Sequence, residues 1–188
     1  MVCYVTRDSL KNQFLLAMPN LVGTYFANTI AYICDHNDSG AMGIMLDRPM
    51  SITLSDLLKQ LKLPCNIDDT LPVVEGGPVQ QERGFILHSD DVVFANSKSL
   101  KDGLMLTTTI EVLEAIGRGE GPRKFLVALG YTGWGGGQLE NELKQDSWLT
   151  CRSSNTVIFD VPFKDRVDRA AQALGINFSL MPNRTGNA

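Results

Sequence analysis

A glycine-rich segment is the part of this sequence whose residue types could do chemistry. Five of the seventeen glycines lie between residues 130 and 137, after the apolar run Phe125–Leu129 and before a stretch that can be helical from Gln138. Ligands of open α/β sheets bind at the carboxyl ends of strands, and glycine allows close approach to the backbone. Free N–H groups at a helix start favour an anion. The candidate ligand-binding residues are therefore Gly133, Trp134, Gly135, Gly136, Gly137 and Gln138.

The spacing of these glycines matches no established phosphate loop. The segment lacks the Lys and Ser/Thr of a P-loop, and its G-x-x-G-x-G-G spacing differs from the dinucleotide fingerprint G-x-G-x-x-G. A tight turn in which Trp134 packs over the glycines is the alternative. The sequence leaves both interpretations open.

A second permissive segment, Glu75-Gly76-Gly77, follows another apolar stretch and carries an acidic side chain. Two such loops could face one crevice, which makes Glu75, Gly76 and Gly77 further candidates, although a plain β-turn also explains them. Arg48 stands in an extended corner before a proline. Its side chain could bind an anionic ligand or form an ion pair with a carboxylate such as Glu75.

Cysteine and histidine give weak signals for metal binding or nucleophilic catalysis. Cys34 and His36 alternate on a predicted strand, share one face and could meet His88 around a metal. A packed cysteine and a hydrogen-bonded histidine are the simpler interpretation. Side chains at i and i+2 of a strand stand ~7 Å apart, too far for direct proton transfer. We assign no metal ligand, no cofactor and no catalytic residue.

The elements that must position these residues are predicted from periodicity and turn signals. The unbroken apolar run Phe125–Leu129 predicts a central strand covered on both faces. Asn37-Asp38-Ser39-Gly40 predicts a hairpin turn between its two flanking strands. The other predicted strands are Phe14–Met18, Thr29–His36, Ala41–Asp47, Pro72–Glu75, Gly84–His88 and Thr156–Val161.

Apolar stripes at helical spacing predict four helices, beginning near Thr53, Thr109, Gln138 and Phe163. Thr53 with Asp56 and Thr108 with Glu111 resemble capping boxes, and Gly119 is a typical helix stop. The sequence thus predicts an α/β protein with a mixed β-sheet layered with helices. We expect one domain over residues 1–188, with room for a smaller α/β lobe in the middle and a mobile tail over 182–188.

Composition and charge limit the classes of function that we expect of this protein. The net charge is −4, and 17 basic residues are dispersed among 21 acidic ones, so no specific DNA binding is expected. The four cysteines show no C-x-x-C spacing, so we expect them to be reduced thiols and the protein to be cytoplasmic. No apolar run is long enough for a signal-peptide core or a membrane span, so we expect no membrane association.

Four segments have an order and spacing that are specific as a set: Leu15–Leu21, Gly40–Pro49, Glu75–Val79 with Gly84–His88, and Leu129–Leu149. Together they resemble the AlgH/YqgE family of bacterial proteins over nearly the whole chain. The resemblance implies a compact α/β fold, a cytosolic location and the family's usual label of transcriptional regulator, with no agreed catalytic residues to carry over. The chain departs from the family pattern at Asp47, Gly136 and Asn187, where Asn, Pro and His are common.

Three hypotheses about function follow. The first is a non-enzymatic regulatory or ligand-binding protein that acts through an unknown protein or a small anionic ligand. The alternative is an enzyme that holds an anionic substrate at the two glycine segments. The third is direct DNA binding, which the acidic composition and the missing helix-turn-helix pattern disfavour.

Overall fold

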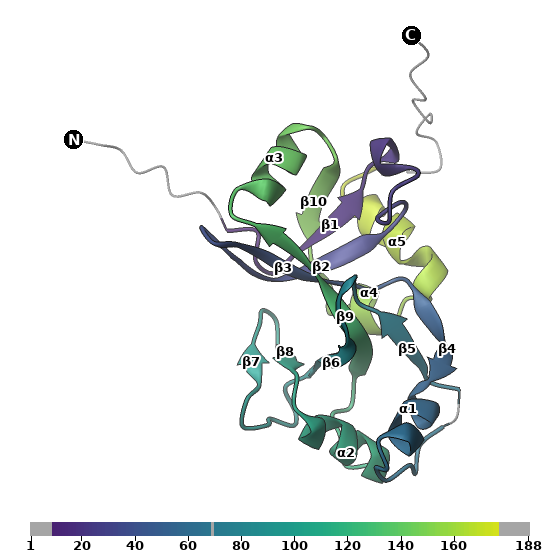
Figure 1. Ribbon diagram of the computed structural model, residues 1–188. Coiled ribbons are helices and arrows are strands. Elements are labelled where there is room, and N and C mark those ends of the chain that lie inside the picture. Colours follow the sequence, from purple (N-terminus) through teal and green to yellow (C-terminus); the bar gives the residue numbers. More distant parts are fainter. Residues whose placement is uncertain (1–8, 69, 177–188) are drawn as a thin grey trace, which may run out of the picture.

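The structure is a computed structural model that describes residues 9–68 and 70–176; the predicted tail 182–188 and Asn187 lie outside these residues. The described chain forms a ten-stranded sheet with the order β10-β1-β2-β3-β9-β6-β8-β7, to which β5 is joined through β9 and β4 through β5 (Figure 1). The pairs are antiparallel except that β5 lies parallel to β9, so the sheet is mixed, as predicted. The strands are β1 (Gln13–Ala17), β2 (Ile30–Asn37), β3 (Gly40–Met45), β4 (Pro49–Thr53), β5 (Pro72–Glu75), β6 (Val79–Ser89), β7 (Lys98–Ser99), β8 (Leu104–Thr107), β9 (Phe125–Gly135) and β10 (Trp148–Arg152). The helices are α1 (Leu54–Gln60), α2 (Ile110–Arg118), α3 (Gln138–Lys144), α4 (Asn155–Phe159) and α5 (Arg166–Gln172), with short 3-10 helices at Pro19–Leu21 and Phe163–Asp165.

Strand β9 runs through the middle of the molecule and belongs to both halves of the sheet (Figure 1). Its first half, Phe125–Leu129, pairs with β6 on one side and β5 on the other, which confirms the predicted interior strand. The prediction of a loop after Leu129 is wrong. The strand bends at Gly130, where φ is +75°, and then continues to Gly135 by pairing with β3. The β-branched and aromatic residues between the glycines favour a strand, and the partner strand satisfies the backbone.

The local signals at the hairpin and the first helix predicted the structure well. Strands β2 and β3 form the expected hairpin, and Thr53 and Asp56 form a complete capping box at α1. Helix α2 stops at Gly119 in the left-handed conformation, as predicted. Its N-cap, however, is Thr109, not Thr108, and the Thr109 side chain accepts no capping hydrogen bond from the helix backbone.

The predicted strand Thr156–Val161 is wrong, because most of this segment forms helix α4. The β-branched residues suggested a strand, in which neighbouring side chains point to opposite faces. In the structure Val157 and Ile158 are both buried in the same core cluster. The strand of this region is β10 instead, and it pairs with β1 at one edge of the sheet.

Helices cover the sheet in three places and define three apolar clusters. Helices α1 and α2 pack on β5, β6 and the first half of β9. Helices α4 and α5 cover the cluster that extends over β1, β2 and β9, and α3 lies over the second half of β9 and β10 (Figure 1). Among the described helices, none has the length and apolar character to cross a membrane.

Candidate functional site

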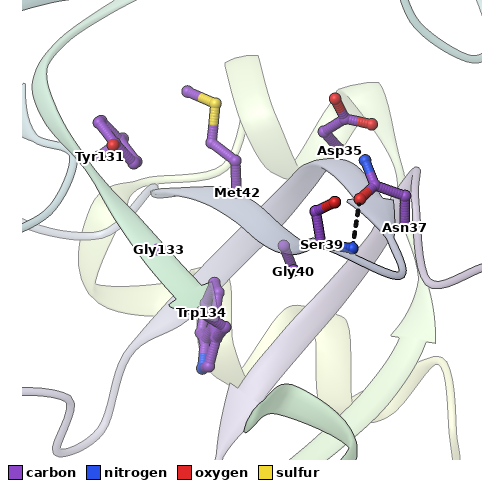
Figure 2. A pocket seen from close by; sticks show the side chains of 9 residues that line it. Asp35, Asn37, Ser39, Gly40, Met42, Tyr131, Gly133 and Trp134 are labelled. Carbon is purple, nitrogen blue, oxygen red and sulfur yellow. Dashed lines mark hydrogen bonds between the residues drawn. The ribbon is translucent and has the colours of Figure 1, made fainter. Parts of the chain in front are cut away.

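A shallow pocket lies where β2, β3 and the second half of β9 meet (Figure 2). Its volume is about 440 Å³, and we call it the sheet-face pocket. The residues that line it are Asp35, Asn37, Ser39, Gly40, Ala41, Met42, Tyr131, Gly133 and Trp134. Of the predicted site residues, Gly133 and Trp134 line this pocket.

The register of β3 against β9 explains why a pocket forms here. Met42 lies opposite Gly133, and Tyr131, two residues along β9, shares the face of Gly133. Because Gly133 has no side chain, the strand backbone is uncovered between the side chains of Met42 and Tyr131. Figure 2 shows these two side chains on one side of the sheet and the Trp134 ring on the other.

The Trp134 side chain is fixed behind the pocket instead of lying beside a ligand. It is 5% exposed and donates from Nε1 to Glu142 Oε2 at 2.9 Å. The indole of Trp148 donates to the same oxygen at 2.7 Å, and Gln138 Nε2 donates to Oε1 at 2.9 Å. Gln138 also accepts from the Gly135 N–H at 3.0 Å. Trp134 and Trp148 thus fasten α3 to the sheet through Glu142, which no sequence pattern indicated, and Gln138 adds a link to Gly135.

The charge of the pocket does not suit the predicted anion. Asp35 is its charged lining residue; its carboxylate pairs with Lys98 at 2.8 Å, and this hydrogen bond lowers the pKa of Asp35. Among the residues that the structure describes, no lysine or arginine lines the pocket. The helix that follows, α3, has seven residues, and its backbone N-cap is Gly137. The lining therefore suits an uncharged ligand better than an anion.

The other glycines of the segment have different surroundings. A Cβ on Gly136 would stand 2.7 Å from the carbonyl oxygen of Asp38, in the turn of the β2–β3 hairpin. Residue 136 must therefore be a glycine for the hairpin turn to lie against it. Gly137 has φ +77° with open space around it, and at Gly135 the nearest atom would be 3.8 Å away. None of these three lines the sheet-face pocket.

Gly76 and Gly77 serve packing between β5 and β9. A Cβ on Gly76 would stand 2.2 Å from the Gly130 carbonyl oxygen, and one on Gly77 would stand 2.1 Å from the Tyr131 carbonyl carbon. Backbone also meets backbone through the bond from the Gly76 N–H to Leu129 O at 2.8 Å. The two glycine segments contact each other directly, backbone against backbone.

Arg48 and Glu75 lie close together and share a partner, Tyr25, that the sequence did not indicate. The Arg48 guanidinium donates to the carbonyls of Tyr25 at 2.6 Å and Ala27 at 3.3 Å and lies over the Tyr25 ring. The Tyr25 hydroxyl donates to the Glu75 carboxylate. Burial, with this carboxylate as a second cause, raises the pKa of Tyr25. Arg48 and Glu75 therefore anchor the segment before β2 and do not line the sheet-face pocket.

Comparison with known proteins places the chain in a family. The profile of the AlgH-like family matches residues 14–179. The chain belongs to the AlgH-like family. A UPF0301 protein of Shewanella sp. (strain W3-18-1) is 47% identical over 96% of this chain and all of its own length. A UPF0301 protein of Methylococcus capsulatus is 46% identical over 96% of this chain and 97% of its own.

Two solved structures share the fold of this AlgH-like protein. The solution structure of the AlgH protein from Pseudomonas aeruginosa is 41% identical, with a TM-score of 0.81 over 97% of this chain and 98% of that one. The crystal structure of the protein DIP2367 from Corynebacterium diphtheriae has a TM-score of 0.71 over 87% and 86% of the two chains. At 16% identity, the second comparison shows likeness of fold alone.

The cysteine and histidine side chains of the AlgH-like chain are spread over separate structural contacts. Burial raises the pKa of Cys34 to about 12. His36 accepts from the Leu10 N–H through Nδ1 at 2.9 Å, so Nε2 carries the proton and donates to Glu140 at 3.2 Å. His88 lies in another contact, between Thr107 and the Ser89 carbonyl. The described residues contain no group of three or more His, Cys, Asp or Glu side chains placed to hold a metal.

Proposed function

We propose that this AlgH-like protein is a non-enzymatic, ligand-binding regulatory protein whose ligand occupies the sheet-face pocket. The observation that carries the proposal is the bare backbone of β9 at Gly133, exposed between Met42 and Tyr131. A pocket of about 440 Å³ falls within the range of small-molecule sites, ~300–1,000 Å³. The rigid support of this backbone by Trp134 and Glu142 favours a preformed site.

The chemistry of the lining points to a small, flat, uncharged molecule. Met42 and Tyr131 offer polarizable apolar contacts on either side of the flat glycine backbone. Asn37 and Ser39 add polar side chains to the lining, and the carboxylate of Asp35 is already bound to Lys98. The enzyme alternative needs a basic side chain to hold an anionic substrate, and none of the described lining residues is basic.

The test is retention of small molecules from a bacterial cell extract, identified by mass spectrometry after the protein is re-isolated. Gly133→Val places a side chain in the pocket, while Gly135→Val adds the same side chain to the same face of β9 outside the lining. We expect wild type and Gly135→Val to retain the same compound and Gly133→Val to retain at least about tenfold less, equivalent to about 1.4 kcal/mol. Equal retention by both variants, with both folded by circular dichroism, would contradict the proposal.

A regulatory role of this kind does not require DNA. Several cations of the described surface are already paired with carboxylates, including Lys98, Arg118 and Lys124. We expect footprinting to show no sequence-specific protection of duplex DNA at ~150 mM salt, where exposed charges are screened beyond about 8 Å. Protection of a defined sequence under these conditions would replace the ligand-binding proposal with a literal DNA-binding one.

We place the protein in the cytoplasm. Cys34, Cys65 and Cys151 are free thiols, and reducing compartments keep thiols in this state. Fractionation of cells followed by immunoblotting is the direct test.

A further inference from the structure

A second pocket, of about 300 Å³, shares no residue with the sheet-face pocket. It lies between the start of β9 and the turn that leads from α4 to α5, and we call it the Arg166 pocket. Its walls come from Leu71–Pro72, Phe125–Val127 and Ile158–Phe163, and Arg166 completes them. Most of these wall residues are apolar, which suits a small apolar molecule.

Arg166 is a buried cation with unused donors. It is 3% exposed, donates from Nε to Val161 O at 3.0 Å and from Nη1 to Leu46 O, and its guanidinium lies 4.2 Å from the centre of the Phe163 ring. These contacts fix the plane of the guanidinium. In residues 9–68 and 70–176, Nη2 has no hydrogen-bond acceptor, and no carboxylate lies within ion-pair distance of the side chain.

The charges near Arg166 leave it positive at neutral pH. Burial lowers the pKa of Arg166 to about 10, and the more distant Asp47 carboxylate opposes this effect. Asp47 is itself occupied, because it accepts from the Thr29 hydroxyl at 2.6 Å and the Ile30 N–H at 3.2 Å. Asp160, the acidic residue of the pocket lining, pairs with Lys124 at 2.7 and 2.8 Å. The pocket therefore combines apolar walls with one buried cation that has no close counter-ion among the described residues.

We propose that the Arg166 pocket binds a small monocarboxylate with an apolar body, whose carboxylate accepts hydrogen bonds from the Arg166 guanidinium. A buried charge is costly unless it is paired, and a planar guanidinium with free donors matches a carboxylate in geometry. The apolar walls then contact the rest of the molecule. This site is independent of the ligand proposed for the sheet-face pocket.

The test uses three probes that separate charge from apolar contact: sodium hexanoate, sodium acetate and 1-hexanol. Each is titrated into ¹⁵N-labelled wild-type protein to roughly 10 mM, about ten times a millimolar Kd. We expect hexanoate to shift the Arg166 Nε–H and the amide signals of Val161 and Phe163 saturably, with at least tenfold weaker binding of the other two. Equal binding of hexanol would exclude recognition by Arg166, and absence of saturable hexanoate shifts would overturn the proposal.

A pair of variants tests the location of the site without removing Arg166. Val161→Trp enlarges a half-buried wall residue of the pocket, while Val93→Trp makes the same change at a valine that is 66% exposed and outside the lining. We expect hexanoate to bind at least tenfold more weakly to Val161→Trp and unchanged to Val93→Trp. Equal binding to both variants would place hexanoate elsewhere and overturn the proposal. If Val161→Trp does not fold, the three titrations of the wild type still decide.

Discussion

The glycines that meet at the bend of β9 and those that lie beyond it serve opposite purposes. Near the bend, Gly76 and Gly130 bring β5 and β9 so close that a Cβ on Gly76 would lie 2.2 Å from backbone. Beyond the bend, Gly133 and Gly135 leave the strand uncovered, and an added Cβ would find 3.3 Å and 3.8 Å to its nearest neighbours, both side-chain atoms. Glycine is a packing requirement in the first region and keeps a surface open in the second, so substitutions distinguish the two.

The largest effect is expected at the packed contact. Gly76→Ala should destabilise the protein by about 3 kcal/mol or more, because overpacking against a fixed backbone costs about 1–3 kcal/mol and occasionally more. Urea unfolding monitored by circular dichroism measures the loss. Gly84→Ala on the neighbouring strand β6 is the control, since its Cβ would meet its nearest atom at an ordinary 3.5 Å. Similar stability of the two variants would show that the β5–β9 contact is not tight.

A smaller loss is expected behind the sheet-face pocket. Glu142→Gln keeps the shape of the side chain but removes the charged acceptor shared by Trp134 and Trp148. Hydrogen bonds to charged groups contribute about 1.5–3 kcal/mol, so we expect a loss near 2 kcal/mol and a change in tryptophan fluorescence. Glu114→Gln, whose side chain pairs with Arg118 on the surface, should cost under about 1 kcal/mol. A loss no greater than that of this control would mean that α3 is held by packing alone.

The packed half should also respond to pH. Burial lowers the pKa of His88 on β6 below its ordinary value of 6.5, so the unfolded chain takes up the proton first as the pH falls. The contribution of His88 to the free energy of unfolding is therefore fully present above about pH 6.5 and declines below it. We expect His88→Gln to reduce the loss of unfolding free energy between about pH 7.5 and pH 5.5, values on either side of the ordinary histidine pKa. An unchanged pH dependence would exclude His88 as its source.

Elements with local signals could be predicted from the sequence. The β2–β3 turn and the Thr53 capping box depend on residues a few positions apart, and both are confirmed. The continuation of β9 beyond Leu129 depends on pairing with β3, about ninety residues earlier in the chain. The glycines of this segment also lower its strand propensity, so the sequence favoured a loop. Helix α4 was missed because its β-branched residues favour a strand locally, whereas burial in the tertiary structure decides otherwise.

The candidate site was harder to predict because its partners come from distant segments. Tyr25, which is hydrogen-bonded to both Arg48 and Glu75, lies in an irregular segment with no periodic pattern of apolar residues. Glu142 stands four residues after Gln138 on a predicted helix, so a link between these two was accessible. The binding of both Trp134 and Trp148 to the Glu142 carboxylate could not be predicted, because it depends on the relative positions of strands β9 and β10.

The smallest effect, and the one with the opposite sign to that at Gly76, is expected in the open half. Gly135→Ala should stabilise the protein by about 0.5 kcal/mol, because alanine reduces the freedom of the unfolded chain where the native backbone accepts it. Gly135 has no positive φ, and its Cβ would meet its nearest atom, in the Gln138 side chain, at an ordinary 3.8 Å. Gly137→Ala is the matched control: its Cβ would also avoid any close contact, but φ is +77°, so a loss of about 1 kcal/mol is expected. Urea midpoints at constant slope measure both. A loss at Gly135 as large as that at Gly137 would show that this half of β9 also needs its glycines for the fold, and the contrast between the two halves would fail.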